Sequence, residues 1–153
     1  MSVLDNATIG ALLRHPNARE ARAKARDVLQ RVGLGHVIDA PARSLGTPGR
    51  KRLEIARALA SEPKVLLLDE AMAGLTPTEV REAIELVRRI HAGGITIVIV
   101  EHIMEVITQL TRRVVVFHQG REIARGTPRE VTSDRRVIEA YLGRRKVRHA
   151  GDA

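Results

Sequence analysis

The chain has 153 residues, and 26 basic residues against 18 acidic ones give it a formal net charge of +8. It has no Cys, which excludes disulfides and thiolate metal sites, and its lack of Trp and single Phe and Tyr argue against aromatic surfaces on which nucleic-acid bases stack. No apolar run approaches the length of a membrane-spanning helix, and the first residues lack the pattern of a secretion signal. We therefore expect one soluble, cytosolic domain with an aliphatic core and no direct membrane insertion.

The excess of basic residues is compatible with a nucleic-acid partner or an anionic membrane surface. Most of these residues, however, alternate with acidic ones along helical segments such as "NAREARAKARDVLQR", and only "GRRKVRH" near the C-terminus is a dense run. This distribution favours solvated helix faces and a frayed basic tail over residues 144–153. A nucleic-acid partner is therefore less favoured than a solvated surface.

The first half of the chain predicts two helices separated by an irregular stretch. The first runs from Asn17, a plausible N-cap, to about Val32, with Gly33 just beyond its end. A stretch that contains Pro41, Gly46, Pro48 and Gly49 follows, and a helical pattern resumes in "RKRLEIARALASE".

The second half alternates strands and helices. Residues 65–69 and 95–100 are short, uniformly apolar runs typical of strands buried on both faces, and a helix between them begins at Thr76 and Pro77. A further helix over 103–110 precedes two strands that meet at Gln119 and Gly120. This order predicts an α/β fold with a parallel sheet, to which the last hairpin adds an antiparallel strand.

Both apolar strands end in ionisable residues. The first run ends in Asp69 and Glu70, and the second ends in Glu101 and His102. The carboxyl ends of parallel strands meet at one edge of a sheet, where ligands bind. These residue types suit Mg²⁺ and nucleotide chemistry, in which one carboxylate holds the metal, a second activates water and a histidine donates to the terminal phosphate.

Several segments resemble one protein family in the same order. "VLLLDEAMAGLTP" followed by "ITIVIVEH" is similar to the Walker B strand, D-loop and switch-histidine strand of the ATP-binding subunit of ABC transporters. "RLEIARALASEP" resembles the helix after the ABC signature, and "MSVLDNATIGALL" the segment after the glutamine loop. "LEIARAL" and "VIEAYLG" resemble, more narrowly, the importers of branched-chain amino acids.

The resemblance implies a partial P-loop NTPase-type parallel sheet with flanking helices, a terminal antiparallel hairpin and part of the ABC helical subdomain. The implied domains are a remnant of that subdomain with the signature loop over residues 1–48, the C-terminal part of the ATPase core over 49–143, and the basic tail over 144–153. The implied cofactors are ATP and Mg²⁺. The implied site residues are Asp69 on Mg²⁺, Glu70 as general base, His102 as switch, the D-loop residues Gly74, Leu75 and Thr76, and the signature residues Leu45, Gly46, Thr47, Pro48 and Gly49.

Other features depart from the family. The chain has no G-x-x-x-x-G-K-[ST] and no Gly-Lys pair, so we expect the C-terminal portion of a subunit that is inactive by itself. Gly46 stands where the signature serine is usual, and Pro48 replaces a glycine and has no N–H. Residues 45–49 therefore fit a working signature and a simple turn-rich loop about equally well. Ala71 and Thr76 stand where proline and Asp or Asn are usual.

Three functions remain open at this point. The first, which the resemblance favours, is that of a C-terminal portion of an ATP-binding protein that couples ATP binding and hydrolysis to solute import, with branched-chain amino acids as the implied solute. It implies a second ATP-binding subunit and membrane subunits as partners, at the inner face of the plasma membrane. The second is a non-catalytic remnant that at most binds transporter subunits. The third, which only the net charge supports, is a small nucleic-acid binder.

Overall fold

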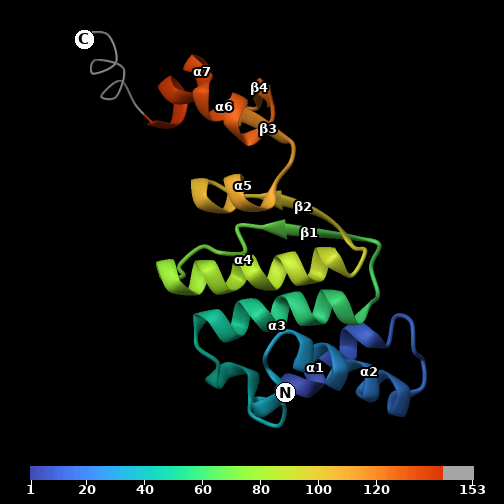
Figure 1. Ribbon diagram of the computed structural model, residues 1–153. Coiled ribbons are helices and arrows are strands. Elements are labelled where there is room, and N and C mark those ends of the chain that lie inside the picture. Colours follow the sequence, from blue (N-terminus) through green and yellow to red (C-terminus); the bar gives the residue numbers. More distant parts are fainter. Residues whose placement is uncertain (143–153) are drawn as a thin grey trace. The chain divides into compact units, whose positions relative to one another are not determined.

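The computed structural model describes residues 1–142, which divide into two compact units, Met1–Glu101 and the residues from His102 onward (Figure 1). The predicted basic tail, residues 144–153, lies outside the described residues. The first unit contains α1 (Val3–Ala11), α2 (Ala18–Arg31), the short 3₁₀ turns η1 (Gly35–Val37) and η2 (Ala42–Ser44), α3 (Thr47–Ala60), β1 (Val65–Asp69), α4 (Pro77–Ala92) and β2 (Thr96–Val100). The second contains α5 (Met104–Leu110), β3 (Val114–His118), β4 (Arg121–Gly126), α6 (Pro128–Ser133), α7 (Arg135–Val137) and η3 (Ile138–Leu142). Over residues 1–142 no helix combines the length and the apolar character that a bilayer span requires.

The helix predicted after Asn17 is confirmed as α2. The Asn17 Oδ1 atom accepts hydrogen bonds from the backbone N–H groups of Arg19 at 2.9 Å and Glu20 at 3.3 Å, as an N-cap does. Beyond the other end, Gly33 has φ +83°, a conformation that glycine adopts without a steric penalty. Local capping therefore sets both ends of this helix.

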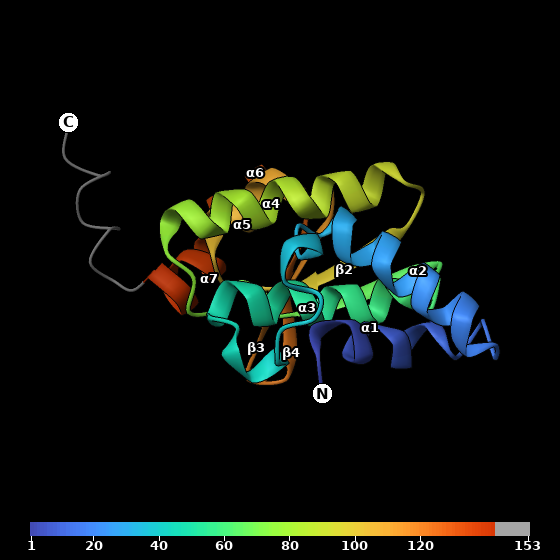
Figure 2. The ribbon, with the colours of Figure 1, turned by 90° about the horizontal axis from the view of Figure 1, so that it is seen from below.

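Helix α1 packs very closely against α3. At Gly10 an added Cβ atom would lie 2.1 Å from the carbonyl oxygen of Arg57, so the two backbones approach one another where α1 has no side chain. Both helices also carry small buried residues near these positions in sequence, since Ala7 and Ala11 of α1 and Ala56 of α3 are fully buried. Figures 1 and 2 show α1 and α2 together against α3.

Strands β1 and β2 form a parallel pair in register from Val65 opposite Thr96 to Asp69 opposite Val100, as predicted. Figures 1 and 2 show α3 and α4 on the same side of this sheet, and Leu66 and Leu68 are buried there. On the other face Leu67 is 74% exposed and its partner Val98 is 46% exposed. The prediction that both strands are buried on both faces is therefore wrong for the described residues, because the helices of the first unit cover one face only.

The predicted hairpin of β3 and β4 is confirmed, with Gln119 and Gly120 both at positive φ, as a two-residue turn requires. It does not add a strand to the parallel sheet, because β3 pairs with β4 in a separate two-stranded sheet. The second unit has its own small core, in which Val114, Val116 and Ile123 of the hairpin pack against Ala124, Val131 and Val137. One side of the hairpin thus packs against the helices that follow it in the chain, while Val115 and Phe117 are exposed.

Candidate functional site

Strand β1 ends between the two carboxylates that were predicted as site residues. Asp69 is the last residue of the strand and Glu70, which is exposed, has φ +44°. A left-handed backbone at a residue other than glycine costs roughly 1–3 kcal/mol and persists only where neighbouring contacts hold it. Here the Glu70 N–H donates to the Val100 carbonyl at 2.9 Å, and the Glu70 carbonyl accepts from the Ala73 N–H at 3.1 Å.

The loop after Glu70 is anchored at Met72. The Met72 side chain is 2% exposed, and its backbone N–H donates to Oε1 of Glu101 at 3.1 Å. Its carbonyl oxygen accepts from the Leu75 N–H at 3.3 Å. From α3, Lys51 Nζ donates to the Glu70 carbonyl at 3.3 Å. The backbone around Glu70 is therefore held by contacts from β2, from α3 and from within the loop.

Helix α3 begins earlier than the sequence pattern predicted. Its first residue is Thr47, with Gly46 as N-cap and Pro48 in the first turn, so the predicted irregular stretch through Gly49 is wrong by three residues. The reason is that proline fits the first turn of a helix, where its missing N–H would have no intrahelical acceptor. No side chain caps this helix, and its first turn presents backbone N–H groups at residues 47 and 49.

The structure brings the predicted signature and D-loop residues together. An added Cβ atom at Gly74, which has φ +78°, would lie 3.9 Å from Cγ2 of Thr47. Helix α3 and the loop also line a cavity of about 20 Å³, whose lining includes Pro48, Ala71 and Leu75. This volume has room for about one water molecule. It is a packing gap that is too small for a nucleotide.

Thr76, where the family usually has Asp or Asn, caps α4. Its Oγ1 accepts from the Glu79 N–H at 3.4 Å, and Glu79 Oε2 accepts from the Thr76 N–H at 2.7 Å. This backbone hydrogen bond from Thr76 lowers the pKa of the Glu79 carboxyl. Because Thr, Asp and Asn all serve as N-caps, the departure at this position preserves the capping of the helix.

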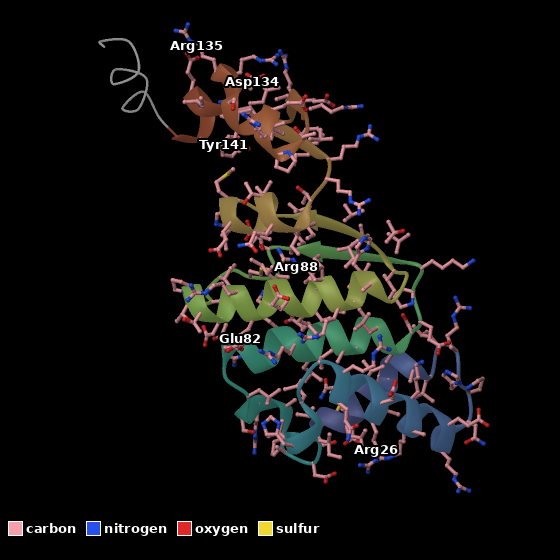
Figure 3. The ribbon with its side chains drawn as sticks, in the orientation of Figure 1. Arg26, Glu82, Arg88, Asp134, Arg135 and Tyr141 are labelled. Atoms are coloured by element: carbon pink, nitrogen blue, oxygen red, sulfur yellow. The ribbon has the colours of Figure 1, made fainter. Side chains whose placement is uncertain are left out.

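Arg52 fixes the helix that carries the candidate signature loop. Its Nη2 atom forms an ion pair with Oε2 of Glu82 at 2.7 Å, and its Nη1 donates to the Val32 carbonyl at 3.3 Å. Figure 3 shows Glu82 on α4. One side chain thus connects α3 both to α4 and to the end of α2.

The candidate metal site contains few protein ligands. Among residues 1–142 no three His, Cys, Asp or Glu side chains are grouped closely enough to hold a metal ion. An exposed single carboxylate such as Asp69 still fits Mg²⁺, which binds through one or two carboxylates together with waters and substrate phosphates. His102 is exposed, precedes α5 and is the first residue of the second unit. Its role as switch, like the roles of the other candidate residues, stays a prediction.

Reasoning from sequence missed three residues that hold the candidate loop. In the sequence pattern Glu101 is only a strand-end carboxylate, and nothing in the pattern assigns a role to Lys51 or Met72. For Met72 a signal exists, because it is an apolar residue in the middle of a turn between a strand and a helix. For Lys51 and Glu101 the contacts depend on the path of the loop, which the sequence pattern does not specify.

Two protein families match the chain. The family described as "ABC transporter" matches residues 1–73, and the family described as "Branched-chain amino acid ATP-binding cassette transporter" matches residues 121–147. Curated relatives include the high-affinity branched-chain amino acid transport ATP-binding protein LivG of Salmonella typhimurium, which is 37% identical over 145 residues, 92% of this chain and 57% of that protein. They also include the lipopolysaccharide export system ATP-binding protein LptB of Escherichia coli, which is 33% identical over 94% of this chain and 60% of that protein.

Solved structures show the same likeness. An ATP-binding cassette of an ABC transporter in its ADP conformation aligns with a TM-score of 0.81 and 29% identity, over 94% of this chain and 63% of that one. The protein cbiO1 from Clostridium perfringens, part of the ABC transporter complex cbiONQ, aligns with a TM-score of 0.77 and 34% identity, over 96% of this chain and 59% of that one. The chain thus spans somewhat more than half the length of the relatives that it matches.

Proposed function

We propose that this chain, which belongs to the ABC transporter family of ATP-binding proteins, supplies the catalytic carboxylate and the signature face of a subunit that hydrolyses ATP to drive transport. The observation that carries the proposal is the loop from Glu70 to Leu75. Hydrogen bonds from the end of β2 and from α3 hold it, and its Gly74 lies next to Thr47 in the first turn of α3.

Each candidate residue has a role in this proposal. Asp69 would hold Mg²⁺, and Glu70 would accept a proton from the attacking water. His102 donates to the terminal phosphate. Bound Mg²⁺ would supply charge neutralisation at the phosphates.

The signature residues Leu45 to Gly49 and the D-loop residues Gly74 to Thr76 face the nucleotide of a second ATP-binding subunit. The backbone N–H groups of residues 47 and 49, at the N-terminus of α3, are the donors that the helix offers to phosphate oxygens. We also propose three domains. They are a remnant of the helical subdomain with the signature loop over 1–48, the C-terminal part of the ATPase core over 49–143, and a basic tail over 144–153. The proposal also includes membrane subunits as partners, at the inner face of the plasma membrane.

We further propose branched-chain amino acids as the transported solute. The match over residues 121–147 to a branched-chain amino acid family supports this choice, and so does the likeness to LivG. The likeness to LptB, an export protein, is the competing observation.

A second candidate function is that of a non-catalytic remnant that binds transporter subunits. Pro48 favours it, because proline removes one N–H group from the first turn of α3, where phosphate oxygens would bind. The two candidates differ in whether the chain supports turnover when the rest of such a protein is supplied.

Complementation tests the proposed function. The chain should be mixed or co-expressed with the N-terminal portion of LivG, which carries the phosphate-cradling segment in this proposal, and phosphate release from ATP measured with and without Mg²⁺. We expect Mg²⁺-dependent turnover from the pair and none from either part alone, because a carboxylate without a phosphate cradle does not position the terminal phosphate. If the pair stays inactive even after Ser-Gly-Gly replaces residues 46–48, the remnant function is supported instead. Turnover by the chain alone would show that it needs no added cradle.

A further inference from the structure

The end of the β1–β2 ladder has an unusual acceptor. The ladder continues one residue beyond β1, where the Glu70 N–H donates to the Val100 carbonyl at 2.9 Å. Strand β2 ends at Val100, and the Met72 amide, two residues after Glu70, finds its acceptor beyond the strand. The Met72 N–H donates instead to Oε1 of the Glu101 side chain at 3.1 Å.

Two hydrogen bonds hold the main chain on either side of Glu70. Val100 accepts from the Glu70 N–H before the turn, and Glu101, the next residue, accepts from the Met72 N–H after it. Because Glu70 has φ +44°, its conformation depends on such neighbouring contacts. A hydrogen bond between a carboxylate and a backbone N–H is among the stronger ones in proteins, and the Met72 side chain at the same point is buried.

We propose that Glu101 is a positioning residue, which sets the place of the Glu70 carboxylate by holding the Met72 amide. The inference rests on the proposed function, in which Glu70 is the general base. Glu101 acts through one acceptor oxygen and exchanges no proton with the substrate. A glutamine at this position retains that oxygen, whereas a leucine of similar size does not.

The first test needs no nucleotide. Amide hydrogen exchange of residues 70–75 should be measured in the isolated chain and in two variants, Glu101→Leu and Glu101→Gln. In Glu101→Leu we expect the Met72 amide to exchange about tenfold faster or more, because its hydrogen bond is lost. In Glu101→Gln we expect a change below about threefold, because a neutral acceptor remains. Unchanged exchange of Met72 in Glu101→Leu would overturn the inference.

The second test uses the complemented protein. Glu101→Leu should lower kcat by about ten- to a hundredfold, since small displacements of a reacting group have effects of that size, while KM for ATP changes less than about twofold. Glu101→Gln should keep most of the turnover, in contrast to Glu70→Gln. A Glu101→Gln variant as inactive as Glu70→Gln would show that Glu101 takes part in the chemistry, against the inference. If the complemented wild-type protein has no turnover, the proposed function fails, and the exchange result alone decides whether Glu101 holds the loop.

Discussion

Replacing Glu70 with Gln is expected to lower Mg²⁺-dependent ATP hydrolysis by the complemented protein by at least about a hundredfold, the usual contribution of a general base. The amide of glutamine keeps the size and hydrogen-bonding reach of the carboxylate but accepts no proton at neutral pH. Nucleotide binding should therefore remain, and the loss should appear in kcat with KM for ATP nearly unchanged. The measurement is steady-state phosphate release beside equilibrium binding of a fluorescent ATP analogue.

Glu54→Gln is the matched control for this change. Glu54 lies exposed on α3, and its carboxylate has no role in the proposed chemistry, so its replacement should leave turnover within about twofold of wild type. His102→Ala should also lower turnover sharply if His102 donates to the terminal phosphate. A Glu70→Gln variant that turns over ATP at the wild-type rate would refute the assignment of Glu70 as general base.

Replacing Gly10 with Ala should destabilise the first unit by about 3 kcal/mol, near the upper end of the usual cost of overpacking. The added methyl group would lie 2.1 Å from the Arg57 carbonyl oxygen, which is backbone and cannot move as a side-chain end could. Relief requires α1 to move away from α3, which loosens the packing between the two helices. At an exposed helix position the same change would stabilise by up to about 1 kcal/mol, so the sign of the effect tests the packing.

Thermal unfolding followed by circular dichroism measures this effect. For a chain of this size a loss of 3 kcal/mol corresponds to a fall in Tm of roughly 6–12 °C. Ile9→Ala, one residue earlier in α1 but 51% exposed, serves as the control and should change Tm little. A Gly10→Ala protein as stable as wild type would mean that α1 and α3 are not in such close contact.

Elements set by local sequence were predictable from the sequence. Asn17 and Gly33 mark the ends of α2, and Gln119 and Gly120 mark the hairpin turn, because capping and positive φ depend on a few adjacent residues. The start of α3 was placed three residues late because Pro48 was interpreted as a turn residue, although proline also suits a first helical turn.

Features that depend on distant segments were not predictable. The need for glycine at position 10 comes from Arg57, which is far along the chain. Leu67 was expected to be buried because apolar runs are typical of covered strands, yet coverage depends on which helices reach each face. In the candidate site the carboxylates at Asp69 and Glu70 were found from the strand pattern, whereas the contact of Glu101 with Met72 arises only from the path of the loop between them.

The exposed face of the β1–β2 sheet has a consequence for how the chain behaves in concentrated solution. Leu67 and Val98 are paired across the two strands and form a water-exposed apolar surface, while the net charge of +8 makes the molecules repel one another. Added salt shortens the range of this repulsion to about 10 Å at 0.1 M and about 3 Å at 1 M, but it does not weaken apolar contacts. Sulfate strengthens them further. Light scattering should therefore show self-association that increases with ionic strength, and more steeply in sulfate than in chloride, so the protein is best kept in dilute, low-salt buffer.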